Sequence, residues 1–252
     1  MKIFKKLFKG NTLYYPGCLT KFALKDIQAS YEEILRREGI DFIKLADKEL
    51  CCGSPVKNAG GKKLFKEIAE KNLKIFKEHS VDRIITNCPA CALVLRKDYK
   101  EILEEQWDIE VQHMTEIITE KNLKQFEGVN NGVATYHDPC HLGRGLEIYE
   151  EPREIIKKAG FEIKEMDLNR EKSYCCGAGG GVKTNNPELS NRIAGERFDQ
   201  AQKTKADKLI TPCPMCFAQF KENAKKQNKK IEIKELSEIL VEKNKKNKNN
   251  KK

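Results

Sequence analysis

The ten cysteines of this 252-residue chain form two sets of five with the same order and nearly the same spacing. In each set a single cysteine is followed by an adjacent pair and then by a C-x-x-C pair. The sets are Cys18, Cys51, Cys52, Cys88 and Cys91, followed by Cys140, Cys175, Cys176, Cys213 and Cys216. Corresponding members lie 122 to 125 residues apart, and ITNCPAC at Ile85–Cys91 recurs as ITPCPMC at Ile210–Cys216. Self-similarity at a fixed period indicates a duplicated module.

Short β-prone runs and helical patterns alternate along both halves of the chain. The predicted strands are Thr12–Tyr15, Phe42–Leu45, Val81–Thr86 and Ile109–Gln112, then Val133–Tyr136, Phe161–Met166, Lys208–Thr211 and Ile231–Ile233. The predicted helices are Lys25–Arg37, Lys62–Glu78, Glu151–Ala159 and Glu188–Lys203. Strands that alternate with helices favour α/β units with parallel sheets. We therefore expect two tandem homologous, Rossmann-like α/β halves with mainly parallel sheets, related by pseudo-twofold symmetry.

Turn-forming residues cluster in EGVNNG at 127–132, between the two cysteine sets, and predict a linker there. The expected organisation is a basic N-terminal extension at 1–11, a first domain at 12–126, a second domain at 133–240 and a tail at 241–252. The tail is rich in lysine and asparagine and is expected to be disordered, because it has almost no apolar surface to bury.

The net charge of +10 comes almost entirely from the two ends of the chain, because ten lysines and Glu242 at 1–10 and 241–252 together contribute +9. The body carries no stripe of basic and aromatic residues, so a nucleic-acid partner is not expected. The first residues lack the apolar core of a secretory signal, and no stretch has the eighteen or so apolar residues of a membrane span. These features predict a cytoplasmic protein, and structural disulfides are rare in that compartment.

Each cysteine motif follows a predicted strand. Ligand sites in open α/β sheets form beyond the carboxyl ends of the strands, so the five thiols of each half are expected to converge. Zinc takes four ligands, as does an ordinary iron–sulfur cubane, and either would leave one thiol unused. One of two adjacent thiols bridging two irons would account for the fifth. A disulfide framework is the alternative that the expected compartment disfavours.

Other residues near the cysteines suit an anionic centre. Pro89 and Pro214 are expected to begin helices whose free N–H groups point at the thiolates. The glycines that follow the cysteine pairs are candidate cofactor-binding residues, with a plain flexible turn as the alternative for the last three: Gly53, Gly177, Gly179, Gly180 and Gly181. His137 and His141 flank Cys140 and are candidate catalytic residues that ligate iron or pass a proton to a leaving thiolate. Capping of the strand end is the alternative role for both histidines.

Several motifs together resemble one known family. They are YYPGC at Tyr14–Cys18, CCGSP at Cys51–Pro55, YHDPCHLGR at Tyr136–Arg144 and CCGAGGG at Cys175–Gly181. The pattern resembles the cysteine-rich CCG domain found in the B and D subunits of heterodisulfide reductase, and is most similar to the D subunit. Related domains occur in the B subunit of thiol:fumarate reductase and in iron–sulfur subunits of glycolate, lactate and glycerol-3-phosphate oxidising complexes.

The resemblance implies that each five-cysteine set binds one noncubane [4Fe-4S] cluster, giving two clusters in the chain. It also implies an oxidoreductase subunit in which a disulfide is split between the clusters. Family members often carry C-x2-C-x2-C-x3-C-P ferredoxin motifs, which this sequence lacks, so electrons would come from a ferredoxin-domain or flavin-containing redox subunit. Peripheral membrane association would then occur only through that partner.

Two other functions fit the same residues. The first is an electron-transfer iron–sulfur subunit of a flavin dehydrogenase complex that oxidises lactate, glycolate or glycerol-3-phosphate. The second is a non-enzymatic module that binds zinc or another metal. The two complete cysteine sets favour redox chemistry over the metal-binding module. The similarity to the D subunit of heterodisulfide reductase favours a disulfide over a hydroxy acid as the redox partner.

Overall fold

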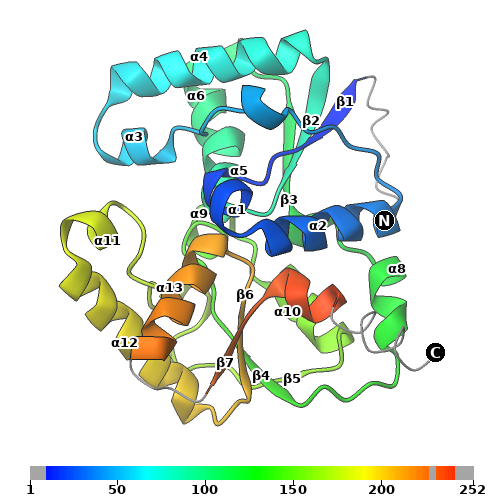
Figure 1. Cartoon of the computed structure of the whole chain (residues 1–252), viewed down its shortest axis with the longest axis vertical. Helices are drawn as coiled ribbons and strands as arrows, with labels where there is room; N and C mark the ends of the chain where they lie inside the picture. Colours follow the sequence, from blue (N-terminus) through cyan, green and yellow to red (C-terminus); the bar gives the residue numbers. More distant parts are fainter. Residues whose placement is uncertain (1–9, 227–230, 242–252) are drawn as a thin grey trace.

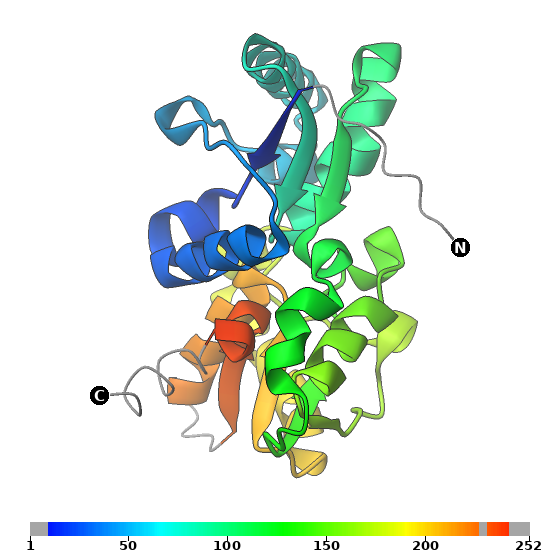
Figure 2. The same cartoon turned by 90° about the vertical axis from the view of Figure 1, so that its right-hand side faces the viewer.

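The computed structural model describes residues 10–226 and 231–241 (Figure 1). Most of the predicted basic N-terminal extension and almost all of the predicted lysine-rich tail lie outside the described residues. Figure 2 shows the first half of the chain, in blue to green, above the second half, in green to red. Residues 127–132 contain no helix or strand and connect the two halves.

The first half contains a three-stranded parallel sheet in the order β1-β2-β3. Its strands are β1 (Asn11–Tyr14), β2 (Val81–Thr86) and β3 (Glu110–His113). The α-helices are α1 (Cys18–Ala23), α2 (Lys25–Glu38), α3 (Ser54–Asn58), α4 (Lys62–Glu78), α5 (Pro89–Leu93), α6 (Tyr99–Leu103), α7 (Met114–Ile117) and α8 (Glu120–Leu123). A π-helical turn, η2 (Val94–Asp98), joins α5 to α6, and 3-10 turns occur at η1 (Ala46–Lys48), η3 (Glu104–Gln106) and η4 (Lys124–Phe126).

The second half contains a four-stranded parallel sheet in the order β5-β4-β6-β7. Its strands are β4 (Val133–Tyr136), β5 (Glu162–Ile163), β6 (Lys208–Thr211) and β7 (Glu232–Glu235). Its helices are α9 (Gly143–Leu146), α10 (Glu150–Lys158), α11 (Val182–Asn185), α12 (Pro187–Lys203) and α13 (Pro214–Lys226), with a 3-10 turn η5 (Arg170–Lys172). The predicted α/β halves with parallel sheets are confirmed.

The predicted strand at Phe42–Leu45 is wrong as a full strand. Ile43 pairs with Leu13 in a single parallel bridge and exchanges backbone hydrogen bonds with Thr12 and Tyr14. The chain leaves the extended conformation at Leu45 and enters η1, because it has to turn toward the first cysteine pair. With this bridge counted, the order of segments in the first sheet matches β5-β4-β6-β7. The predicted strand at Phe161–Met166 is likewise shortened, to β5.

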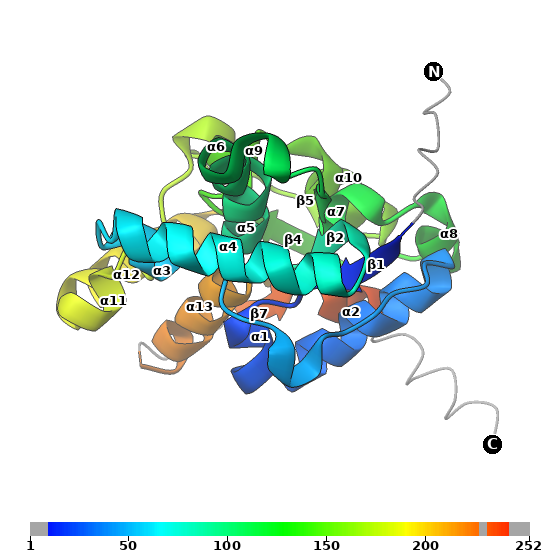
Figure 3. The ribbon, with the colours of Figure 1, turned by 90° about the horizontal axis from the view of Figure 1, so that it is seen from above.

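The two halves pack against each other reciprocally. Helix α1, which begins at the first cysteine of the first set, contacts α13, which carries the last cysteine of the second set. The two helices lie side by side in Figures 1 and 3. In the equivalent contact with the halves exchanged, Ala92 and Leu93 of α5 pack on Leu142 and Leu146 around α9. Both contacts join the cysteine-bearing ends of the halves, so each group of thiols is built close to the other half.

Candidate metal centres

The first cysteine set is brought together by three loops at the carboxyl ends of the parallel strands. The sulfur of Cys52 lies 3.5 Å from that of Cys91. The pKa shifts of the other thiols place Cys51 next to both Cys18 and Cys52, and Cys88 next to Cys91. The five sulfurs therefore form one contiguous group of neighbours.

The second set is assembled in the same way and with the same order of contacts. The sulfur of Cys176 lies 3.3 Å from that of Cys216. The pKa shifts of the other thiols place Cys175 next to both Cys140 and Cys176, and Cys213 next to Cys216. The duplication in the sequence is thus also a duplication of local geometry.

Crowding of the thiols decides which of them ionises readily. The pKa of Cys51 is lowered to about 2 because thiols of Cys18 and Cys52 donate hydrogen bonds to its sulfur. The pKa of Cys18 is raised by the same bond, and burial raises it further. The pKa values of Cys175 and Cys140 repeat this pair of opposite shifts. Five thiolates this close repel one another, so full ionisation of either set needs a cationic centre among the sulfurs, for which iron and zinc are the usual soft choices.

Backbone donors support both groups. The N–H of Gly53 donates to the Cys51 sulfur at 3.5 Å, and the N–H of Gly177 donates to the Cys175 sulfur at 3.4 Å. Both glycines have a positive φ, of 85° and 79° respectively, which favours glycine. Pro89 begins α5 and Pro214 begins α13, as predicted. The N–H groups of the first turn of α5 donate to the sulfur of Cys88.

The three glycines at 179–181 are arranged differently. A Cβ built on Gly179 or Gly180 would meet no atom within 4 Å, and one on Gly181 would meet only the Asn185 side chain. This loop therefore stands clear of its surroundings and leads into the short helix α11. A cofactor-binding role for Gly179, Gly180 and Gly181 stays a prediction.

Replacing Gly177 with alanine is expected to lower the free energy of unfolding by about 1–3 kcal/mol, the range for a strained backbone position. The added Cβ would lie 2.7 Å from the Ser190 carbonyl oxygen, in a conformation that alanine avoids. Gly179→Ala is the matched control in the same loop, and we expect a change within about 0.5 kcal/mol because its Cβ meets open space. Urea denaturation of both variants measures the difference. Equal stabilities would show that the turn at Gly177 tolerates a side chain.

His137 is fully buried against the second set. One of its ring nitrogens and the sulfurs of Cys176 and Cys216 lie within 4.8 Å of one another. The Nε of Arg197 donates to Nδ1 of His137 at 3.1 Å. Because a guanidinium only donates, Nδ1 accepts, and in the neutral ring the proton is on Nε2. Nε2 has no hydrogen-bond partner among the described residues.

The unpartnered Nε2–H of His137 indicates what kind of group the second set can hold. A buried N–H beside sulfur atoms and a buried guanidinium both call for an anionic acceptor. An iron–sulfur cluster held by thiolates is such an acceptor, so the residues present fit the group that the family resemblance implies. A zinc-ligating histidine normally donates its second N–H to a carbonyl or carboxylate. His137 instead receives a hydrogen bond at that nitrogen, which favours a hydrogen-bonding role over direct ligation.

His141 lies at the junction of the two halves. Its Nδ1 is 3.5 Å from the sulfur of Cys140. Burial lowers its pKa, and the first-half residues Asp98 and Lys57 contribute to its electrostatic surroundings. Lys57 and Asp98 form an ion pair of 2.6 Å between α3 and η2. His141 is partly buried. It lies next to a thiol of the second set and near charged groups of the first half.

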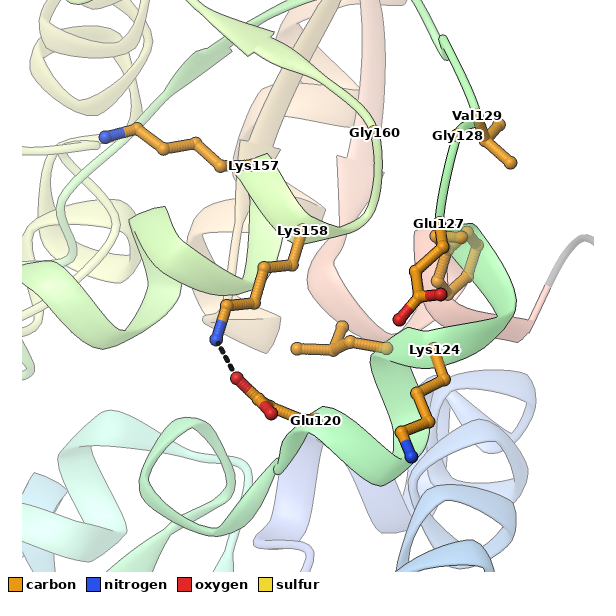
Figure 4. Close-up of a pocket in the computed structure, with 10 residues that line it drawn as sticks. Glu120, Lys124, Glu127, Gly128, Val129, Lys157, Lys158 and Gly160 are labelled. Atoms are coloured by element: carbon orange, nitrogen blue, oxygen red, sulfur yellow. Dashed lines mark hydrogen bonds and ion pairs between the residues drawn. The ribbon is translucent and has the colours of Figure 1, made fainter.

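A surface cavity of about 340 Å³ opens elsewhere, between α8 and α10 (Figure 4). Lys158 and Glu120 form a 3.0 Å ion pair across it, and Lys124 and Glu127 line the opposite side. None of its lining residues is a cysteine or histidine. This cavity is separate from the two candidate centres. No helix in the described ranges is both long enough and apolar enough to span a bilayer.

Known proteins resemble this chain over most of its length. The model of the cysteine-rich domain matches residues 12–96 and 134–221. An uncharacterised iron–sulfur protein of Methanocaldococcus jannaschii is 33% identical over 239 residues, covering 92% of this chain and 47% of that protein. The D subunit of the dihydromethanophenazine:CoB–CoM heterodisulfide reductase of Methanosarcina acetivorans is 31% identical over 241 residues, covering 93% and 59%. A probable iron–sulfur-binding oxidoreductase of Bacillus subtilis is 32% identical over 222 residues, covering 86% and 31%.

The chain spans only 31% to 59% of the length of these three relatives. Each of them therefore contains sequence with no counterpart here. Two of the three are named as iron–sulfur or iron–sulfur-binding proteins, one as a heterodisulfide reductase subunit and one as a probable oxidoreductase.

Proposed function

The chain belongs to the cysteine-rich domain family, and we propose that it is the iron–sulfur redox subunit of a heterodisulfide-reductase-like complex. In this proposal it reduces a disulfide, or passes electrons, together with a partner protein. The observation that carries the proposal is the contiguous group of five thiols, formed in both halves with the same order of contacts.

The cofactor of each set in this proposal is a noncubane [4Fe-4S] cluster. Cys18, Cys51, Cys52, Cys88 and Cys91 would hold one cluster, and Cys140, Cys175, Cys176, Cys213 and Cys216 the other. Such clusters supply one-electron oxidation and reduction, and two of them match the two electrons that a disulfide consumes. The fifth thiol in each group supports an opened cluster over a four-ligand cubane or zinc site.

The protein's own side chains supply proton and hydrogen-bond chemistry. Reducing a disulfide breaks one S–S bond, consumes two electrons and two protons, and yields two thiols. His141 is only partly enclosed beside Cys140 and is suited to deliver a proton to a leaving thiolate. His137 is sealed from solvent, and its Nε2–H would instead donate a hydrogen bond to the anionic centre.

The partner in this proposal is a ferredoxin-domain or flavin-containing redox subunit. Relatives named as parts of oxidoreductases are longer than this chain, so their electron donors and substrates come to it only as proposals. A cytoplasmic location, with peripheral membrane association through the partner, belongs to the same proposal. A nucleic-acid partner lies outside it.

A second candidate function is electron transfer for a flavin dehydrogenase of lactate, glycolate or glycerol-3-phosphate type. The Bacillus subtilis relative, named as a probable iron–sulfur-binding oxidoreductase, is consistent with this function. A zinc-binding module is the third candidate, with His137, Cys176 and Cys216 as its natural ligands. The proton on Nε2 of His137 counts against it.

The test is to prepare the protein anaerobically, reduce it, remove excess reductant and offer two oxidants in separate samples. One is a small mixed disulfide and the other is an oxidised flavoprotein electron carrier. Reoxidation by the disulfide with two thiols formed for each disulfide supports the first function, and reoxidation by the flavoprotein alone supports the second. Protein that contains stoichiometric zinc and no iron would contradict both.

A further inference from the structure

The two cysteine groups have matching geometry but different neighbours at equivalent positions of the repeat. Three residues before the first cysteine of each set, the first half has Tyr15 and the second has His137. Sixteen residues before each C-x-x-C pair, the first half has Asn72 and the second has Arg197. The second half of the duplicated module therefore has a histidine–arginine pair where the first half has two uncharged residues.

A third difference also makes the surroundings of the second set more positive than those of the first. Two residues before each adjacent pair, the first half has Glu49 and the second has Ser173. Glu49 is partly buried, and burial raises its pKa to about 7. Ser173 is buried, and its hydroxyl accepts a hydrogen bond of 3.1 Å from Arg197. At the same position of the repeat, the first half thus has the carboxyl group of Glu49 and the second half has Ser173, which binds Arg197.

Arg197 is fully buried, and its hydrogen-bond partners among the described residues are uncharged. It donates to the ring of His137, the hydroxyl of Ser173, the carbonyl of Leu168 and the amide of Gln200. Burial lowers its pKa to about 10, so the guanidinium remains charged at neutral pH. A buried cation whose hydrogen-bond partners are neutral is stabilised by nearby negative charge, and Asp138, Cys216 and Glu165 are the groups whose negative charge acts on Arg197. Arg197 is hydrogen-bonded to His137, and His137 lies beside the sulfurs of Cys176 and Cys216.

The corresponding side chains of the first half form a neutral network. Asn72 donates to the Tyr99 hydroxyl at 2.8 Å and to the Cys51 carbonyl at 3.0 Å. The Tyr15 hydroxyl donates to the Leu50 carbonyl at 2.5 Å and so is engaged with backbone.

Other charges near the two sets do not reverse this difference. Asp138 beside the second set is neutralised by a bidentate ion pair with Arg153, whose other partner, Glu165, is partly exposed. Beside the first set, Lys21 lies near Glu49 and is itself partly exposed. Charges that reach water are screened, whereas the buried Arg197 is not.

We propose that the two centres are electrically unequal, and that the Arg197–His137 pair makes the second set the centre that is reduced first. This inference rests on the proposed function, since it requires a redox cluster at each set. Adding an electron makes a thiolate-bound cluster more negative. A buried cation and an N–H donor stabilise that form, because hydrogen bonds to the sulfurs and nearby charge set the reduction potential of iron–sulfur sites. The chain would thus take up an electron at the second set before the first.

The experiment is an anaerobic redox titration of the cluster-loaded protein, followed by electron paramagnetic resonance. We expect two separate reduction steps. Cys52→Ser, which disables the first set, should keep the step at higher potential, and Cys176→Ser should keep the step at lower potential. Arg197→Gln should lower the midpoint potential of the higher step. The expected change is at least tenfold in the ratio of reduced to oxidised cluster, which is about 59 mV for one electron.

Two further variants separate charge from packing. Arg197→Lys retains the positive charge. At the higher step, its ratio of reduced to oxidised cluster should stay within about twofold of that of the parent protein, a result that loss of packing would not give. Arg144→Gln removes an exposed arginine that also lies beside the second set and bonds to the Ser173 carbonyl. Its effect should be small because water screens that charge.

The inference is overturned if both centres titrate together, if the first set is reduced first, or if Arg197→Gln leaves the higher step in place. If Arg197→Gln does not fold, the assignment of the two steps with the cysteine variants and the behaviour of Arg197→Lys still decide it. Iron content is measured before each titration. Protein without iron would refute the proposed function itself, whereas iron-loaded protein with equal or reversed potentials would refute only this inference.

Discussion

Replacing Cys52 with serine is expected to remove about half of the iron from anaerobically prepared protein and to leave the other half unchanged. Parent protein should hold about eight irons, four for each cluster. Cys52 is buried and touches both Cys51 and Cys91, so it joins the adjacent pair to the C-x-x-C pair. A serine hydroxyl is a poor ligand for iron at a soft thiolate site. Losing this central contact should therefore empty the first set.

Cys176→Ser is the matched control, because Cys176 joins the same two motifs of the second set through its contact with Cys216. It should remove the complementary half of the iron and of the spectroscopic signal. The double variant should hold none. Iron and acid-labile sulfide assays, together with electron paramagnetic resonance of the reduced protein, measure all three. Complete iron loss in either single variant would mean that the two sets share one centre instead of holding one each.

Replacing Arg153 with alanine is expected to lower the free energy of unfolding by about 3–5 kcal/mol, the cost of leaving a buried charge without its partner. Arg153 and Asp138 are 1% and 2% exposed and form a bidentate pair with distances of 2.7 and 2.9 Å. The same guanidinium stacks over the Tyr136 ring and contacts Glu165. It thereby connects α10 to the segment just before Cys140 and to the segment between Cys140 and Cys175.

Urea denaturation measures this loss. Arg36→Ala is the control, because Arg36 pairs with Glu32 while its own side chain is 63% exposed. We expect that change to cost at most about 1 kcal/mol. Replacing Arg153 and Asp138 together with methionine and leucine should recover most of the loss, since neither charge would remain buried alone. A cost for Arg153→Ala similar to that of the control would mean that Asp138 has another way to be neutralised.

Much of the fold followed from the pattern of the sequence. The strands at Val81–Thr86, Val133–Tyr136 and Lys208–Thr211 and the helix at Lys62–Glu78 have the predicted bounds. These segments combine regular apolar periodicity with clear turn formers at their ends. The convergence of each set of thiols also followed from local rules, because the carboxyl ends of parallel strands meet at one edge of a sheet.

The features that escaped prediction depend on tertiary contacts. The segment around Ile43 is β-prone, but its pairing stops where the chain turns toward Cys51. The sequence pattern places Arg197 in a helix, and nothing local shows that it is buried against His137. Counting back from each C-x-x-C pair aligns it with Asn72 and reveals the change of charge between the halves.

The reciprocal contacts of α1 with α13 and of α5 with α9 have a mechanical consequence. Each of these contacts ties a cysteine-bearing segment of one half to such a segment of the other half. A hinge motion that opened or closed the space between the halves would pull on both groups of thiols together. A molecule that wedged the halves apart would therefore act on both of these contacts in the same movement.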